Sequence, residues 1–363
     1  MQRLKVYEDM GNIITDLKPQ QNERKRYVLG EIKNTIITRS KYSELNKDFK
    51  RIHINDQVKR NTKRFILKKK PIGKREETEA ETKKSPQIIR NRRLSSLFRV
   101  SEYANDIYKY LQRIEEKYPI SNSVRLESIF GEKNRFALVD WLVDINEHFQ
   151  FVHETLQLCV SIVDRYLQEQ DSLNKKEMEL IALAAVFIAS KYEELVPIEL
   201  LDLLRMSCCS SSIEEVLDME MKIARKLQYS FGKPVAAHFV RRYSNVAHAT
   251  GLEQSCAFYL TDVALMSSKL SLYKPSIIAA SALSIALFVS NGTVDRSLWN
   301  QTLIKYSTYK IKDLEECIKE LAECQKKAKL SKYQAIEKKY SKVMHFSVTQ
   351  ITGLQIVIEA LAM

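Results

Sequence analysis

Apolar residues recur at helical spacing from Tyr103 onward, whereas the first hundred residues show no such period. Apolar positions three and four apart place one stripe on a helix, and that stripe packs on a core. The chain has only 8 Gly and 7 Pro, the two residue types that most disfavour helix interiors. The pattern therefore predicts an all-α body. The expected helices span 102–117, 133–149, 153–169, 174–192, 197–205, 212–227, 235–247, 252–268, 274–290, 295–303 and 309–328.

Two of the predicted helices are apolar on every side. Leu180–Ala189 and Ile277–Phe288 contain no charged residue and are rich in alanine. Such a helix must be surrounded by other helices. Each is the third of five, and the two lie about 95 residues apart, which predicts a five-helix unit that occurs twice. The expected domains are a tail over 1–100, a first unit with a leading helix over 101–230, a second unit over 231–350, and a C-terminal helical tail over 351–363.

Charge separates the first hundred residues from the rest. Residues 1–100 hold 27 Lys+Arg and 12 Asp+Glu, a net +15; subtracted from the totals of 58 and 45, this leaves 31 and 33, a net −2. Because residues 1–100 also lack apolar periodicity, they cannot bury enough surface to offset the entropy of ordering, and we expect a disordered tail. The body has no overall positive field, which argues against nucleic-acid binding by it.

Several functional classes find no support in the sequence. No run of about 18 uncharged apolar residues predicts a membrane span, and the polar start Met1–Lys5 predicts no secretory signal. The six cysteines form no C-x-x-C pair and lack zinc spacing, which indicates reduced thiols in the cytosol or nucleus. No phosphate-binding loop, serine-hydrolase or zinc-protease motif occurs, and we expect His148 and His153 on the solvated surface. The sequence predicts no enzyme, metal or cofactor.

Four charged residues interrupt apolar stretches. Glu220 falls within an apolar stripe that includes Leu217, so its carboxylate snorkels, pairs internally or faces a partner. Lys191 follows a long apolar run, at a helix end where a lysine complements the helix dipole. Arg135 and Asp164 interrupt two further apolar runs, and a buried pair between them is the favoured interpretation. From the residues alone, Lys191 is interpreted as structural, whereas for Glu220 an internal pair and a contact with a partner both stay open.

Several segments resemble the cyclin box, a five-helix unit that occurs twice in cyclins. They are Asn134–Asp144 (NRFALVDWLVD), Ala189–Glu194 (ASKYEE) with Pro197, Met219-Glu220 and Lys274–Ser276 (KPS). In addition, Tyr103–Tyr108 (YANDIY) resembles the helix that precedes the box in mitotic cyclins. The similarity covers roughly residues 101–350 in order. Within the family, VHETL at 152–156 and the RRY and AHA motifs at 241–243 and 247–249 are most similar to the B-three group of B-type cyclins.

The resemblance implies two tandem cyclin boxes and a function. B-type cyclins are regulatory subunits, not enzymes, and they bind and activate a mitotic cyclin-dependent kinase that drives passage from G2 into mitosis. In this family the residues matching Lys191 and Glu220 hydrogen-bond the kinase backbone, and Arg135 with Asp164 forms a structural salt bridge. The implied apolar contacts are Tyr103, Ile107, Tyr192, Ala224 and Phe231. The alternative is a TFB-type transcription factor, which shares the duplicated fold but binds DNA; the slightly acidic body and the family residues argue against it.

The family's substrate-docking groove maps onto Asn134, Ala137, Leu138, Trp141, Asp144 and Glu179. Cyclins usually have Met and Ile where this chain has Asn134 and Ala137. A docked peptide therefore covers several methylene groups fewer, and each would have contributed about 0.8 kcal/mol of favourable binding free energy if fully buried. Leu138 and Trp141 keep an apolar floor, and the two carboxylates can still attract a basic residue. We therefore expect weakened docking of R-x-L peptides from kinase substrates and inhibitors.

Two motifs lie in the tail. The first matches the destruction box of mitotic cyclins at Arg26, Leu29, Ile32 and Asn34. It implies recognition by the anaphase-promoting complex, a ubiquitin ligase, at mitotic exit. The second is a basic cluster around Lys68, Lys69 and Lys70, which suits nuclear import, although a solvated charge run has the same composition. The expected location is the nucleus, with a cytoplasmic pool.

Overall fold

The structure is a computed structural model that describes residues 103–120, 131–168, 170, 174–207 and 211–362. Helices α4 and α6–α10 span Ala104–Glu115, Glu132–Phe149, His153–Leu167, Lys175–Glu193, Leu200–Ser207 and Ile213–Lys226. Helices α11–α15 span Ala236–Val246, Gly251–Ala264, Pro275–Asn291, Gln301–Ser307 and Ile311–Leu330. Helices α16 and α17 span Ala335–Tyr340 and Thr352–Leu361, and short 3-10 helices η1–η4 span Leu270–Leu272, Arg296–Leu298, Val343–His345 and Val348–Gln350. The described residues contain no β-strand, in agreement with the predicted all-α class.

Local sequence signals fix several helix ends. Ser212 and Thr250 each begin a helix with a capping box. Their hydroxyls accept a hydrogen bond from the backbone N–H of the glutamate three residues later, and the carboxylate of that glutamate accepts one from the backbone N–H of the cap residue. Pro275 stands in the first turn of α13, where the missing N–H costs nothing. Gly292 ends the same helix with φ +75°, a left-handed conformation that favours glycine.

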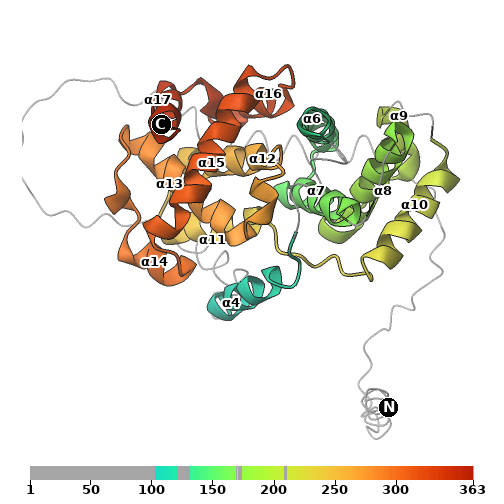
Figure 1. Ribbon diagram of the computed structural model, residues 1–363, viewed down its shortest axis with the longest axis horizontal. Coiled ribbons are helices and arrows are strands. Elements are labelled where there is room, and N and C mark those ends of the chain that lie inside the picture. Colours follow the sequence, from blue (N-terminus) through green and yellow to red (C-terminus); the bar gives the residue numbers. More distant parts are fainter. Residues whose placement is uncertain (1–102, 121–130, 169, 171–173, 208–210, 363) are drawn as a thin grey trace, which may run out of the picture. The chain divides into compact units, whose positions relative to one another are not determined.

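Each five-helix unit surrounds a buried central helix, as predicted. In the first unit, α8 packs against α6, α7, α9 and α10, and Ile181–Ala185 have no exposed surface. In the second, α13 packs against α11, α12 and α15, and α17 adds a further contact. Figure 1 shows α6–α10 on one side and α11–α17 on the other, with α4 below their junction. Two five-helix units in tandem are therefore confirmed.

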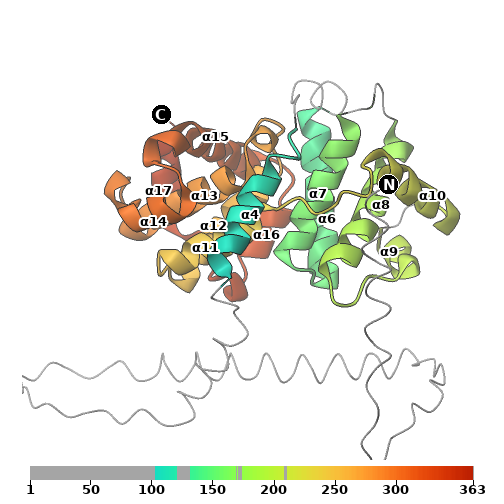
Figure 2. The same cartoon turned by 90° about the horizontal axis from the view of Figure 1, so that it is seen from below.

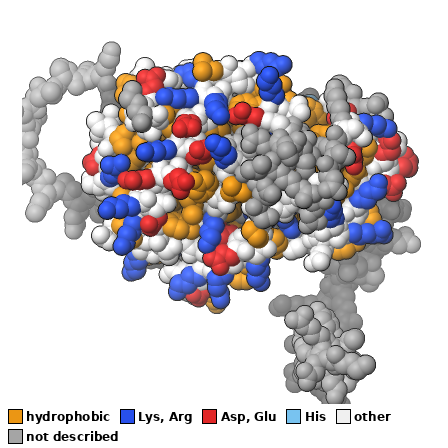
Figure 3. Space-filling view, in the orientation of Figure 1, with side chains coloured by type: hydrophobic (Ala, Val, Ile, Leu, Met, Phe, Trp, Pro, Cys, Tyr) orange, Lys and Arg blue, Asp and Glu red, His pale blue; other side chains and the backbone are white. Residues whose placement is uncertain are grey.

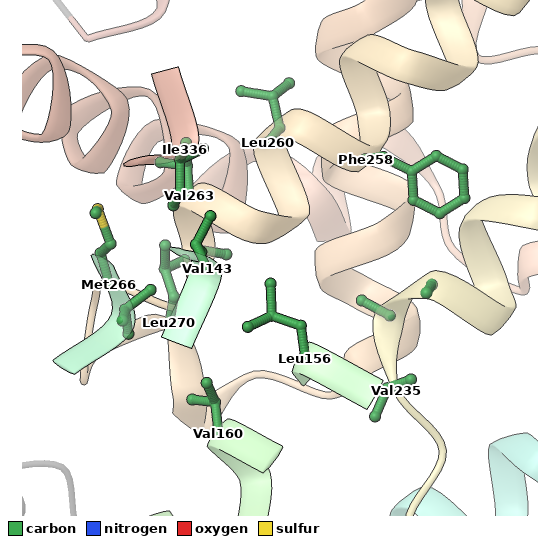
Figure 4. Packing of buried hydrophobic residues seen from close by; sticks show 14 of the residues in the cluster. Val143, Leu156, Val160, Val235, Phe258, Leu260, Val263, Met266, Leu270 and Ile336 are labelled. Carbon is green, nitrogen blue, oxygen red and sulfur yellow. The ribbon is translucent and has the colours of Figure 1, made fainter. Parts of the chain in front are cut away.

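One hydrophobic core joins the two units. Val143 of α6, Leu156 of α7, Val263 of α12 and Ile336 of α16 all belong to it, and Figure 4 shows such side chains together in one region. The burial of apolar side chains in this core is the main favourable contribution to folding. The units are therefore held together by continuous packing, which fixes the positions of the helix ends that form the surfaces described below.

The predicted elements differ from the structure in two places. The prediction of one helix over 295–303 is wrong, because a 3-10 turn comes first and α14 begins only after Asn300. The Asn300 side chain accepts a hydrogen bond from the Leu303 backbone N–H at 3.0 Å and so caps α14. Helix α16 has no counterpart among the predicted helices. It has six residues, too few for a helical period, and its start is fixed by Asp140, which accepts from the Ala335 backbone at 2.6 Å. The C-terminal α17 lies in the segment expected to be helical.

A buried polar network lies between α7, α12 and α16. Asp262 has no exposed surface and accepts from Lys339 at 3.0 Å and from the Tyr340 hydroxyl at 2.7 Å. The His153 ring stacks on Phe258 with centroids 4.2 Å apart and lies 3.7 Å from the Asp262 carboxylate. The prediction of a solvated surface position is therefore wrong for His153, because the second unit covers it; His148 is exposed as expected.

Candidate partner-binding surfaces

Lys191 and Glu220 pair with each other at the surface. Lys191 lies in the last turn of α8 and Glu220 in the middle of α10, and the Nζ donates to the Oε1. Their side chains keep 39% and 21% exposure, so a partner can reach both. The Lys191 ammonium also lies 3.9 Å from the centre of the Phe187 ring, a cation–π contact. The pair is thus preorganised by its own charges and remains accessible.

Exposed apolar side chains surround this pair. Tyr192 is 53% exposed; of the two apolar residues that come after it, Leu195 is fully exposed and Val196 is 64% exposed. On α10, Leu217 and Met221 are both 44% exposed and flank Glu220 in sequence. Clustered apolar side chains on a protein surface mark interaction sites. We call the set Lys191, Tyr192, Leu195, Val196, Leu217, Glu220 and Met221 the α8–α10 surface.

Some of these residues depart from the sequence-based expectation. Leu217 was expected to face the core, but it points to solvent, because the stripe of α10 that packs on α8 runs through Val216, Met219 and Ile223. Ala224, an expected contact, is only 7% exposed, so the chain itself covers its methyl group. Leu195 and Val196 were missed; two apolar residues directly after Glu193-Glu194 and before Pro197 were the signal.

Helix α4 presents a second apolar row. Tyr103, at its N-cap, is 61% exposed, Ile107 is 45% exposed and Tyr110 is 53% exposed. Positions i, i+4 and i+7 share one helical face. The opposite side of α4 is fixed to the second unit by Tyr108, whose hydroxyl donates to the His238 carbonyl at 3.3 Å, and Figure 2 shows α4 in front of α11. Tyr110 was not among the expected contacts.

The linker after α10 lies between α4 and the end of α8. The Tyr118 hydroxyl is hydrogen-bonded to Ser230 at 2.9 Å. The Tyr192 hydroxyl lies so close to Gly232 that a Cβ there would meet it at 2.9 Å. Phe231 is half-buried and packs on the core. The structure therefore brings the end of α8, the linker and the α4 segment into neighbouring positions.

The residues expected to form a docking groove lie mainly on α6. Asn134 and Asp144 are exposed, Ala137, Trp141 and Glu179 are half-buried, and Leu138 is 9% exposed. Burial and the neighbouring Asp140 carboxylate raise the pKa of Asp144, while Lys338 acts in the opposite direction. On the same helix face, Glu147 pairs with Lys342. The acidic end of this surface therefore has lysines from the second unit beside it.

Arg135 and Asp164 form a buried two-pronged pair. Nη1 and Nη2 of Arg135 donate to Oδ1 and Oδ2 of Asp164 at 2.5 and 2.8 Å, and the two residues are 4% and 3% exposed. Arg135 Nε donates to the Leu265 carbonyl at 2.9 Å, a bond to the second unit that no sequence motif indicated. Burial acts to lower the pKa of Arg135, but the Asp164 charge outweighs it and raises that pKa.

The tail motifs lie outside the described residues. They comprise Arg26, Leu29, Ile32, Asn34, Lys68, Lys69 and Lys70. Within the described residues, no three His, Cys, Asp or Glu side chains gather where a metal ion could be held. No helix within the same residues has the length and apolar character that crossing a membrane requires.

Comparisons with known proteins identify the fold family. Residues 106–232 match the family described as "Cyclin, N-terminal domain" and residues 234–353 match "Cyclin, C-terminal domain". The X-ray structure of a viral cyclin from herpesvirus saimiri superposes with a TM-score of 0.52 at 21% identity, over 61% of this chain and 97% of that one. This likeness supports the fold.

Two relatives narrow the group. A G2/mitotic-specific cyclin-B of Spisula solidissima is 33% identical over 302 residues, which cover 83% of this chain and 65% of that protein. A G2/mitotic-specific cyclin-B of Hydra vulgaris is 33% identical over 255 residues, which cover 70% and 69%. The match spans slightly less than two thirds of the Spisula protein's length. The chain belongs to the cyclin family and is similar to B-type, G2/mitotic members.

Proposed function

We propose that this chain is a regulatory subunit, without catalytic activity of its own, that binds and activates a mitotic cyclin-dependent kinase. The observation that carries the proposal is the Lys191–Glu220 pair, which is accessible and has exposed apolar residues close to it on α8 and α10. The B-type relatives support the same function, and nothing in the comparisons supports the TFB-type alternative.

The mechanism follows from what this surface can supply. Its apolar side chains pack against the regulatory helix of the kinase, and Lys191 and Glu220 exchange their mutual bond for hydrogen bonds to the kinase backbone. The helix is then held inward, so that the kinase's own Lys–Glu ion pair forms and its activation loop leaves the cleft. Because Lys191 and Glu220 already satisfy each other in the free chain, neither is left as an unpaired charge before binding.

The test is a double replacement, Lys191→Ala with Glu220→Ala, in the full-length chain. Kinase binding and histone phosphorylation should fall sharply, because charged hydrogen bonds desolvated at an interface are worth several kcal/mol when broken. The matched control is Lys176→Ala with Glu215→Gln, because Gln keeps an acceptor for the Ser212 backbone N–H in the capping box. This pair also joins α8 to α10, at 2.8 Å, but is more exposed and lies outside the α8–α10 surface. Circular dichroism shows whether both variants fold. Normal activation by the first variant contradicts the proposal.

We further propose that kinase substrates and inhibitors dock with reduced affinity on the surface formed by Asn134, Ala137, Leu138, Trp141, Asp144 and Glu179. Support comes from the half-buried Trp141, three residues from the buried Leu138, and from Asp144 and Glu179, which can attract a basic residue. Trp141→Ala should abolish the residual binding of an R-x-L peptide, whereas Asn134→Met with Ala137→Ile should strengthen it by restoring apolar surface. Equal binding by all three forms contradicts this assignment.

Degradation at mitotic exit is a separate proposal that rests on the tail. Arg26, Leu29, Ile32 and Asn34 form an extended motif suited to short-peptide recognition by the anaphase-promoting complex. Arg26→Ala with Leu29→Ala should stabilise the chain through anaphase while kinase activation stays normal. Equal half-lives of variant and wild type contradict the proposal.

Location in the nucleus is likewise a proposal from the tail. Lys68, Lys69 and Lys70 lie within a basic cluster of the type used for import. Replacing all three with Ala should shift the chain toward the cytoplasm, as seen by fluorescence microscopy of a tagged protein. Unchanged nuclear accumulation contradicts the simple form of this proposal.

A further inference from the structure

We propose that a groove between the start of α6 and the end of α15 docks an extended acidic peptide that carries an apolar side chain. The groove has a volume of about 630 Å³. Its lining includes Lys133, Phe136, Lys327, Leu330, Lys332 and Tyr333. We call it the α6–α15 groove. It lies apart from the α8–α10 surface, so the inference does not depend on kinase binding.

The apolar part of the groove can hold a side chain. Leu330, the last residue of α15, is 89% exposed. Tyr333 is half-buried, and Phe136 is 7% exposed, so its ring belongs to the floor. An exposed leucine over an aromatic floor gains contacts only when another apolar group covers it. An anchor of this kind, surrounded by polar side chains, is typical of peptide-binding sites.

The lysines of the groove favour a partner with negative charge. Lys133 and Lys332 are exposed, and neither has an acidic partner within the described residues. Lys327 is bonded to Glu132 across the groove at 3.1 Å, so the remaining charge at the rim is positive. Complementary charge at an interface steers association and excludes partners of the wrong sign.

This positive charge is local. Residues 326–342 contain seven lysines and one glutamate, a net +6, although residues 101–363 together carry −2. Three of these lysines, Lys327, Lys339 and Lys342, are paired with acidic residues from other helices. The space-filling view shows Lys or Arg side chains over α15 and α16 (Figure 3). A local basic patch on a slightly acidic body fits a short acidic segment better than a long polyanion, because distant parts of the body would repel the polyanion.

A nucleic acid is the other class of acidic ligand, and the groove favours it less. Phosphate-backbone contacts need no exposed leucine, whereas an apolar side chain of a peptide can cover Leu330. The apolar anchor therefore favours a peptide. A duplex DNA probe in the experiment separates the two classes.

The experiment measures fluorescence anisotropy with the full-length chain and no kinase. The probe is a fluorescein-labelled peptide GDELEFEG; the comparison peptides are GNQLQFQG, which lacks the charges, and GDESESEG, which lacks the apolar residues. We expect the first to bind and each comparison peptide to bind at least about tenfold more weakly, since both charge and apolar burial contribute. Affinity for the first should fall as salt rises.

Three variants locate the site. Lys133→Glu with Lys332→Glu should reduce affinity at least about tenfold through repulsion, and Leu330→Ser should reduce it several-fold. The matched control is Lys312→Glu with Lys319→Glu, two exposed lysines near the other end of α15. It should bind as wild type. All variants should activate the kinase normally, which separates this inference from the proposed function.

Three outcomes overturn the inference. One is the absence of saturable peptide binding up to about 1 mM, the weak limit of specific recognition. The second is equal loss of affinity in the control pair, which would mean that general charge rather than the groove attracts the peptide. The third is tighter binding of a 20-base-pair DNA duplex that the same Lys133 and Lys332 replacements abolish, which assigns the groove to nucleic acid.

Discussion

Replacing Arg135 with Met tests how the two cyclin boxes are held together. The change removes the guanidinium but keeps an unbranched apolar stem of similar length. Asp164 then loses both of its bonds, at 2.5 and 2.8 Å, and the Leu265 carbonyl of the second box loses its donor at 2.9 Å. Asp164 is 3% exposed, so water cannot replace the lost partner without opening the fold.

The expected cost is large. Breaking a buried ion pair by removing one partner costs about 3–5 kcal/mol, because a buried charge is left uncompensated. Taking about 4 kcal/mol, and about 2–4 °C per kcal/mol for a body of this size, the melting temperature should fall by roughly 8–16 °C. Arg135→Met with Asp164→Leu should recover most of the loss, because no unpaired charge then remains.

The assay is urea unfolding of the full-length chain followed by circular dichroism at 222 nm. Wild type, both single variants and the double variant complete a double-mutant cycle. Replacing Lys176 with Ala and Glu215 with Gln is the matched control. It removes an exposed pair that should be worth only about 0–1 kcal/mol, and Gln keeps an acceptor for the Ser212 backbone N–H in the capping box. A loss below about 1 kcal/mol for Arg135→Met, or a double variant less stable than the single one, would refute the reasoning.

Three further predictions concern buried titratable groups. Burial acts to raise the pKa of Asp262, but Lys339 and His153 outweigh it and hold that pKa far below its usual value. The ionised Asp262 therefore stabilises the folded chain above about pH 4, and this contribution is lost as the pH falls. Between pH 6 and 3, wild type should therefore lose more urea resistance than Asp262→Asn, and parallel losses would contradict this. Burial lowers the pKa of Lys233 to about 8, so stability should rise between about pH 8 and 10.4, where the unfolded chain binds more protons. Lys233→Met should thus raise the melting temperature at pH 7 more than at pH 10, whereas a drop at pH 7 would show that the ammonium has a favourable partner. Burial also raises the pKa of Cys256, Cys317 and Cys324 to about 12; mass spectrometry should find them alkylated by iodoacetamide at pH 8 only after unfolding, and rapid alkylation of the native chain would contradict their burial.

The long helices and their duplication follow from the amino-acid pattern alone. Continuous apolar runs such as Ile277–Phe288 predict a central helix without any knowledge of its neighbours, because a helix that is apolar all round can only be buried. Caps such as Ser212 act within four residues, so they too are visible in the sequence. The uneven distribution of charge and the cyclin-box motifs are equally local, and they pointed to the family before any contact was known.

Which side chains meet depends on how the helices pack. Lys191 and Glu220 are 29 residues apart, and their mutual bond depends on how α10 packs on α8. The same packing turns Leu217 outward. His153 stacks on Phe258, 105 residues away, although its own helix gives no sign of this contact. Such pairings depend on how whole helices pack. Rotating a helix about its axis by one residue position changes the face that it buries. The apolar pattern of a helix limits this rotation, but it does not determine which neighbouring side chain each residue meets.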